Sequence, residues 1–134
     1  MGFLRRALFG DGRLSEDLKA RLADEDLLLL VEELAGTLTY RDYHAPNRRS
    51  NLEKFAVTGG VAVTGRRLVA WTGRGENVNV PLDDARVRDM DIAVEPGRIR
   101  IAYDPSVFNP QVTGRVELRF QTAKAAEIVA LVSR

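Results

Sequence analysis

The chain of 134 residues contains no cysteine and only one histidine, His44. The lack of cysteine excludes disulfides, thiolate metal ligands and a cysteine nucleophile. A single histidine is too few for a histidine-rich metal site and argues against a Ser-His-Asp triad. No glycine-rich cofactor motif or metal-ligand spacing is found either. We therefore expect a protein that is not an enzyme and that uses no cofactor and no metal.

Long hydrophobic runs are also missing. The longest apolar run, Leu27–Val31, is strand-sized, whereas a membrane-spanning helix needs about 20 apolar residues. Residues 1–9 lack the long apolar core and the cleavage site of a secretory signal. Arg6 stands where a myristoylation signal carries serine or threonine. The sequence therefore predicts a cytoplasmic protein.

Neither sign of charge dominates. Twenty lysines and arginines face nineteen aspartates and glutamates, which leaves a formal charge of +1. Whole-molecule attraction to nucleic acid or to an anionic membrane is therefore not supported, and we expect no nucleic-acid partner. Only a local patch of charge can provide such attraction. The length fits one domain with a core of its own.

The amino-terminal part predicts one short helix. The breaker cluster Gly10-Asp11-Gly12 precedes Ser15, which is suited to cap a helix from Glu16 to Ala23. Leu14, Leu18 and Leu22 recur at helical spacing. We divide the chain into an amino-terminal helical extension, residues 1–26, and a domain of residues 27–134.

The segment from Asp26 to Tyr40 has two interpretations. Its leucine-rich first half suits a helix by propensity, but Gly36 interrupts it and residues 37–40 alternate as in a strand. We favour a long first strand from about Leu28 to Tyr40, bulged or bent near Gly36. A longer amino-terminal helix is the alternative.

Beyond a polar loop at residues 41–51, apolar residues alternate in six further segments: 55–63, 68–71, 78–82, 90–94, 99–103 and 116–120. The break Thr64-Gly65, with a glycine able to adopt a positive φ, predicts a hairpin. Across the turn Pro96-Gly97 we expect Glu95 to face Arg98 and Arg100 to lie near Asp91.

At Thr122 the apolar period changes from two to about 3.6. This predicts a helix from about Thr122 to Ser133, with Ile128, Val129 and Val132 buried against the strands. The expected fold class is therefore mainly β (α+β). It is a roll of about seven antiparallel strands capped by a carboxy-terminal helix, with a short amino-terminal helix.

Three segments resemble bacterial PH-like (pleckstrin-homology or GRAM-like) domains: Val61–Trp71, Val78–Leu82 and Val116–Ala123. The resemblance covers about residues 28–133. It implies a bent pair of antiparallel sheets whose open end is plugged by the helix. It also implies binding of phosphoinositides, peptides or proteins. The inositol-phosphate clamp of lipid-binding members, Lys-x(n)-Arg-x-Arg, is not cleanly present.

Two groups of residues are candidate sites. Arg41, Arg48, Arg49 and Lys54, near the loop after the first strand, are candidate ligands for an anion, because guanidinium groups bind phosphate and carboxylate well. The alternative is a solvated loop. Phe3, Leu4, Leu8 and Phe9 are candidate contacts to a partner or a membrane. The alternative there is a segment that packs on its own domain or a disordered terminus.

Trp71, the single tryptophan, is expected in the core. Clustered carboxylates can bind a cation or share catalysis, which makes Asp83, Asp84, Asp89 and Asp91 a third group to consider, but we favour a turn and a solvated strand face for them.

The sequence thus favours a binding module, and two functions compete. One is protein–protein interaction or self-assembly, with a protein partner or a homo-oligomer. The other is binding of an anionic ligand or phospholipid headgroup by the basic loop, with peripheral contact to anionic lipid. We favour interaction, because a net charge of +1 exerts little long-range attraction toward an anionic membrane.

Overall fold

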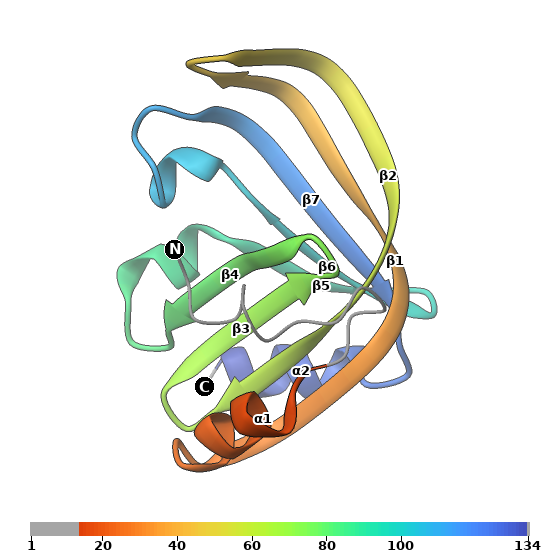
Figure 1. Ribbon diagram of the computed structural model, residues 1–134, viewed down its shortest axis with the longest axis vertical. Coiled ribbons are helices and arrows are strands. Elements are labelled where there is room, and N and C mark those ends of the chain that lie inside the picture. The colour runs from red at the N-terminus through yellow and green to blue at the C-terminus, as the bar shows by residue number, and fades with distance from the viewer. Residues whose placement is uncertain (1–13, 134) are drawn as a thin grey trace.

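The computed structural model describes residues 14–133 as a curved β-sheet with two α-helices (Figure 1). The elements are α1 (Glu16–Ala23), β1 (Leu27–Ala45), β2 (Arg48–Thr64), β3 (Arg67–Thr72), β4 (Gly75–Pro81), the 3-10 helix η2 (Ala85–Asp89), β5 (Asp91–Glu95), β6 (Arg98–Tyr103), the 3-10 helix η3 (Pro105–Val107), β7 (Thr113–Gln121) and α2 (Ala125–Val132). The expected class, mainly β with a helix at each end, is confirmed.

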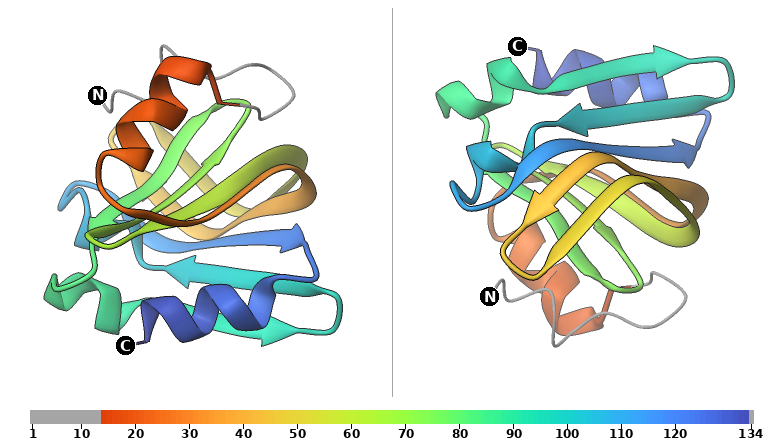
Figure 2. Two further views of the ribbon diagram at one scale, coloured as in Figure 1. Left: turned by 90° about the horizontal axis from the view of Figure 1, so that it is seen from below. Right: turned by 90° about the horizontal axis from the view of Figure 1, so that it is seen from above.

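The strands form one seven-stranded sheet in the order β4-β3-β2-β1-β7-β6-β5, and every neighbouring pair is antiparallel. This is one continuous sheet, not the pair of sheets that the resemblance implied. The sheet curls so that α1 and α2 lie at opposite ends of the molecule with strands between them (Figure 2). β4 is an edge strand that ends at Pro81, as its alternating pattern predicted.

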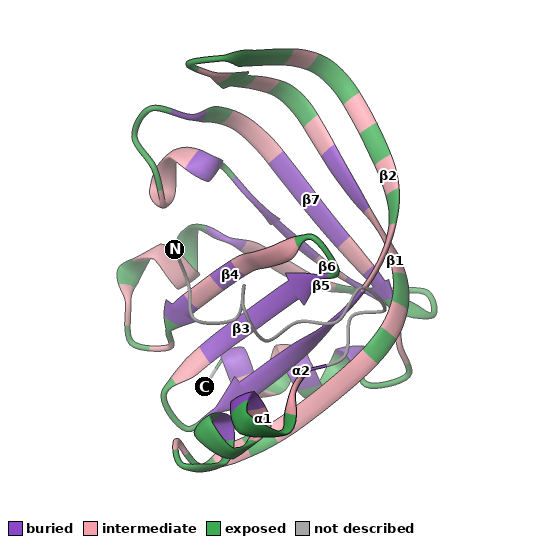
Figure 3. Cartoon of the chain, in the orientation of Figure 1, coloured by how far each residue is buried: buried purple, intermediate pink, exposed green. Residues whose placement is uncertain are grey.

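The main core fills the inner, concave side of the sheet. Alternate residues of the strands point into it, among them Val61, Ile101, Leu118 and Phe120, and Ile128 of α2 is fully buried against them. Buried residues concentrate in the body of the sheet, whereas the far end of the β1–β2 hairpin shows intermediate and exposed residues (Figure 3).

A second, smaller core lies between α1 and the outer side of β2 and β3. Leu18 and Leu22 of α1 pack there with Ala62, Val69 and Trp71. The expected burial of Trp71 is confirmed, at 0% exposure. Because β2 and β3 are covered on both faces, their sequences are nearly continuous apolar runs at this point.

α1 begins where its cap predicts. The Ser15 hydroxyl accepts a hydrogen bond from the Leu18 backbone N–H at 3.2 Å, which confirms the N-cap. Glu16 and Asp17 lie in the first turn, where the helix dipole favours negative charge.

The long first strand is confirmed, but the loop predicted at residues 41–51 is wrong. β1 continues to Ala45, and β2 begins at Arg48 after a turn at Pro46 and Asn47. Polar composition indicated exposure here, but it does not exclude a hairpin. The two strands pair in register from Ala45–Arg48 onward, so their backbone groups hydrogen-bond to each other.

The glycines have other roles than the sequence indicated. The register shift of β1 nearest to the predicted position lies between Val31 and Leu34, where Glu33 has φ 56°, and not at Gly36. A Cβ at Gly36 would collide with the Arg119 carbonyl oxygen, so Gly36 allows β1 to approach β7 closely. Gly65 does not adopt a positive φ. Its N–H donates to the Asp26 carbonyl at 2.9 Å.

α2 begins at Ala125, three residues later than predicted. The Thr122 hydroxyl accepts a hydrogen bond from the Lys124 N–H at 3.0 Å, so it stabilises a turn before the helix and does not cap it. Ile128 and Val132 are buried as expected, and Val129 is partly buried against the main core.

Candidate functional site

The four basic residues predicted as one anion site are divided between the two sides of the hairpin. Arg41 pairs with Glu117 on the outer side of the sheet. Arg48 pairs with Glu53 and stacks near aromatic residues that pack against the inner core. Lys54 lies opposite Thr39, and Arg49 lies opposite His44. Phe3, Leu4, Leu8 and Phe9 lie outside the described residues.

The guanidinium group of Arg48 already has interaction partners within the chain. Its Nη2 donates to Glu53 Oε1 at 2.8 Å, and its guanidinium carbon lies 5.0 Å from the ring centre of Tyr40 and 5.4 Å from that of Tyr43. The hydrogen bond from Arg48 lowers the pKa of the Glu53 carboxyl below its ordinary value. On the same side, the Arg74 guanidinium lies 4.5 Å from the Phe55 ring centre. The sequence pattern did not indicate that Arg74 lies against Phe55.

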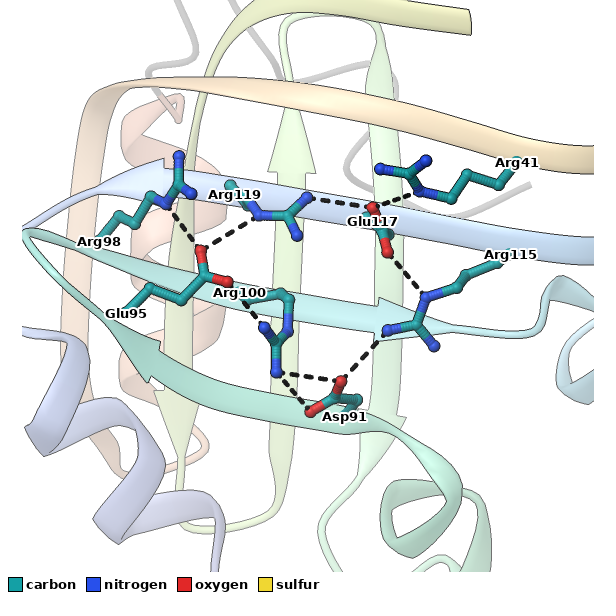
Figure 4. Close-up of polar contacts among 8 residues, drawn as sticks. All are labelled: Arg41, Asp91, Glu95, Arg98, Arg100, Arg115, Glu117 and Arg119. Atoms are coloured by element: carbon teal, nitrogen blue, oxygen red, sulfur yellow. Dashed lines mark hydrogen bonds and ion pairs between the residues drawn. The ribbon is translucent and has the colours of Figure 1, made fainter. Parts of the chain in front are cut away.

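A large charged cluster lies on the outer face of β1, β7, β6 and β5 (Figure 4). We call it the arginine cluster, and its members are Arg41, Asp91, Glu95, Arg98, Arg100, Arg115, Glu117 and Arg119. The two pairs predicted across the Pro96-Gly97 turn are confirmed: Arg98 Nε donates to Glu95 at 2.6 Å, and Arg100 Nη2 donates to Asp91 at 3.2 Å.

Arginines lie directly opposite each other at two places in the cluster. The strand register pairs Arg41 with Arg115 and Arg100 with Arg119. Like charges directly across two strands destabilise a sheet unless a counter-charge separates them. Glu117 provides this charge for the first pair: Arg41 Nε and Arg115 Nε donate to its two oxygens at 2.9 and 2.8 Å.

Glu117 has a third donor, Arg119 Nη1, at 3.1 Å, and its side chain is only 8% exposed. Burial by itself raises the pKa of this carboxyl. The hydrogen bonds from Arg115, Arg41 and Arg119 outweigh burial and lower the pKa to about 2. Glu117 therefore remains ionised at neutral pH and stabilises three guanidinium groups.

Glu95 separates the second opposed pair. Arg119 Nε donates to its Oε1 at 3.1 Å, and Arg100 Nη1 donates to its Oε2 at 2.7 Å. Burial raises the pKa of Glu95, but the hydrogen bonds from arginines lower it overall. Asp91 connects the two halves, because Arg100 and Arg115 each approach it to 3.2 Å, and these bonds lower its pKa.

The cluster carries more positive charge than its carboxylates neutralise. Five arginines and three carboxylates leave a local charge of +2, compared with +1 for the whole chain. The side chains of Arg41, Arg98 and Arg115 are 49%, 47% and 43% exposed. These three side chains are therefore accessible from solvent while the carboxylates hold their guanidinium groups in place.

A small hollow adjoins the cluster. It has a volume of about 110 Å³ and is lined by Ala35, Gly36, Thr37, Arg98, Arg119 and Gln121. Two of these side chains are arginines that donate to Glu95. The hollow therefore offers positive charge in a partly enclosed space next to the outer face of the sheet.

Of the eight cluster members, only Arg41 was among the predicted site residues. The signal in the sequence that could have pointed to the cluster was the alternation of Arg115, Glu117 and Arg119, which indicated a polar strand face. It did not indicate that β7 lies between β1 and β6.

Between residues 14 and 133, no three histidine, aspartate or glutamate side chains are placed to hold a metal ion. In the same range, no helix has the length and hydrophobicity needed to span a bilayer. Comparison with protein-family models, with curated proteins and with solved structures finds no match to this chain. The resemblance to PH-like domains therefore stays a prediction.

Proposed function

We propose that this chain is a non-enzymatic binding module that recognises an acidic segment of a partner protein on the outer face of β1, β7, β6 and β5. The observation that carries the proposal is the excess of guanidinium groups in the arginine cluster. Five arginines are gathered around three carboxylates, and the outermost three are almost half exposed.

The chemistry of the cluster favours carboxylates as ligands. Guanidinium groups donate two parallel hydrogen bonds to a carboxylate. Among the described residues, Arg41 and Arg98 donate to the cluster from Nε, which leaves their two Nη groups for a ligand. Because Glu117 and Glu95 already hold these side chains, binding costs less side-chain entropy than it does for mobile arginines.

The shape of the site favours an extended polypeptide. The cluster spreads over four neighbouring strands and ends at a hollow of only about 110 Å³, which is small for a complete metabolite. An acidic segment can place several carboxylates on such a face at once. Its attraction comes from a local charge of +2 and should weaken as salt screens it.

The test is binding of a fluorescently labelled polyglutamate peptide, measured by anisotropy in low salt. A double substitution, Arg41→Gln with Arg98→Gln, removes the two most exposed guanidinium groups of the cluster. We expect its affinity to fall about a hundredfold, since each of the two guanidinium groups loses a charge-assisted hydrogen bond worth about 1.5 kcal/mol. Arg88→Gln, on η2 outside the cluster, is the matched control and should bind as the wild type does.

Three results would contradict the proposal. The first is that polyglutamate does not bind the wild-type protein. The second is that the double variant, shown by circular dichroism to be folded, binds as well as the control. The third is that vesicles with anionic lipid bind while polyglutamate does not, which would favour the phospholipid-headgroup alternative.

A further inference from the structure

β2 has a long free edge. It pairs with β1 from Arg48 onward, but it pairs with β3 only over Gly59–Val63. Within residues 14–133, no strand lies on the other side of β2 between residues 48 and 57. Figure 1 shows this part of the β1–β2 hairpin extending well past β3. An unpaired edge of this length can pair with another strand.

The direction in which the backbone groups of β2 point can be determined where the pairing of β2 with β3 ends. There the Thr58 carbonyl accepts a hydrogen bond from the Gly73 N–H at 2.8 Å, so it points toward the β3 side. Hydrogen-bonding direction alternates along a strand. Ala56 and Lys54 therefore present their N–H and C=O groups to the same free edge, and both residues are exposed.

A hollow of about 360 Å³ lies at this point of departure, which we call the fork. It is lined by Ala56, Val57, Thr58, Gly73 and Arg74. The hollow lies beside β2 directly beyond the end of β3. A strand added to the free edge of β2, in line with β3, would therefore begin in this hollow. Arg74 is exposed there and holds its guanidinium over the Phe55 ring, which places a positive charge beside that position.

The charges along the free edge of β2 indicate which kind of strand can pair with it. Residues 48–58 carry three cations, Arg48, Arg49 and Lys54, and one carboxylate, Glu53, and Arg74 adds a cation at the fork. A second copy of this chain, paired antiparallel through the same edge, would bring cations beside cations, which is unfavourable. An acidic strand has the complementary charge.

The free edge is continuous with the face that carries the proposed function. Lys54 pairs with Thr39, and Thr39 pairs with Glu117 of the arginine cluster. Side chains of directly paired residues share a face of the sheet, so Lys54 extends the row of charges to the edge. A strand added at β2 continues that face by one strand.

We infer that a part of the acidic partner beyond the part that lies on the arginine cluster binds in extended form, as an additional antiparallel strand along residues 52–58 of β2, with its first residues in the hollow beside Arg74. This inference rests on the proposed function for the class of partner and adds the place and geometry of binding. Backbone hydrogen bonds to Lys54 and Ala56 provide affinity, and the cations of the edge provide the preference for acidic sequence.

The first test uses a nine-residue peptide of alternating glutamate and valine, and a copy methylated on the backbone nitrogens of one edge. Ala56→Pro removes a donor from the free edge, where proline is tolerated, and Ala56→Ser is the matched control that keeps it. We expect about fivefold weaker binding for Ala56→Pro, which loses one hydrogen bond worth about 1 kcal/mol, and a larger loss for the methylated peptide, which loses several. Ala56→Ser should bind as the wild type does.

The second test needs no variant. Hydrogen exchange of the wild-type protein, saturated with the unmethylated peptide, should show slower exchange at the Lys54 and Ala56 amides. Unchanged exchange at both amides would overturn the inference. If binding depends on Arg41 and Arg98 while Ala56→Pro and the methylated peptide bind normally, the inference fails and the proposed function stands. If no acidic peptide binds, both fail. Protection of these amides without peptide, with a mass that grows with concentration, would instead identify a second copy as the occupant and overturn the inference.

Discussion

Replacing Glu117 with glutamine tests whether the arginine cluster stabilises the fold. The substitution keeps the size of the side chain but removes the charge that separates Arg41 from Arg115. In the variant these two guanidinium groups still lie opposite each other in the sheet. We therefore expect Glu117→Gln to lower the free energy of unfolding at pH 7.

The lowered pKa of Glu117 sets an upper limit on how much stability the substitution can remove. It falls from an ordinary 4.5 to about 2, which at about 1.4 kcal/mol per pH unit corresponds to at most about 3.5 kcal/mol. Water around the half-exposed arginines screens the interaction. We therefore expect a loss of about 1 to 2 kcal/mol for Glu117→Gln at pH 7, after discounting for this screening.

The pH dependence has a definite sign. Because the pKa of Glu117 is lower in the folded protein, its contribution is present above pH 4.5 and is lost as the pH falls from 4.5 toward 2. The difference in stability between wild type and Glu117→Gln should therefore be largest near neutral pH and should shrink over this range.

The assay is urea unfolding at a series of pH values, followed by the fluorescence of Trp71, which is fully buried. Glu127→Gln is the matched control, because Glu127 is 58% exposed and, among residues 14–133, its ion pair is with Lys124 at 3.4 Å. It should change the free energy of unfolding by less than about 0.5 kcal/mol. Equal effects of the two substitutions, or a Glu117 effect that does not vary with pH, would refute the reasoning.

Two further predictions concern the cores. Leu22→Ala should lower the free energy of unfolding by about 3 kcal/mol and shift Trp71 emission to longer wavelength, because it opens a cavity between α1 and β3. The exposed neighbour substitution Ala23→Ser should leave the emission unchanged, and an unchanged emission in Leu22→Ala would contradict the packing of α1. Burial raises the pKa of the Tyr103 hydroxyl above its ordinary 10.0, so the stability it contributes is lost as the pH rises beyond 10. In urea unfolding at alkaline pH, Tyr103→Phe should lose stability less steeply than the wild type, and parallel curves would contradict this.

The sequence by itself determined the features that depend on near neighbours in the chain. The alternation of apolar residues predicted the strands, and Ser15 predicted the start of α1, because side-chain period and capping act over a few residues. The pairs of Glu95 with Arg98 and of Asp91 with Arg100 were also predictable, since they belong to one hairpin closed by the turn Pro96-Gly97.

Only the tertiary structure decided which strands became neighbours, and the arginine cluster depends on that. Arg41 donates to Glu117 across 76 positions of sequence, because β7 lies between β1 and β6. A strand's pattern shows which face of it is polar but not what lies beside it. For the same reason the sequence placed Arg41 and Arg48 in one site, although the fold sends them to opposite sides of the hairpin. Likewise, the free edge of β2 could be recognised only from the structure. It exists because β3 ends at Thr72 and does not pair with residues 48–57 of β2.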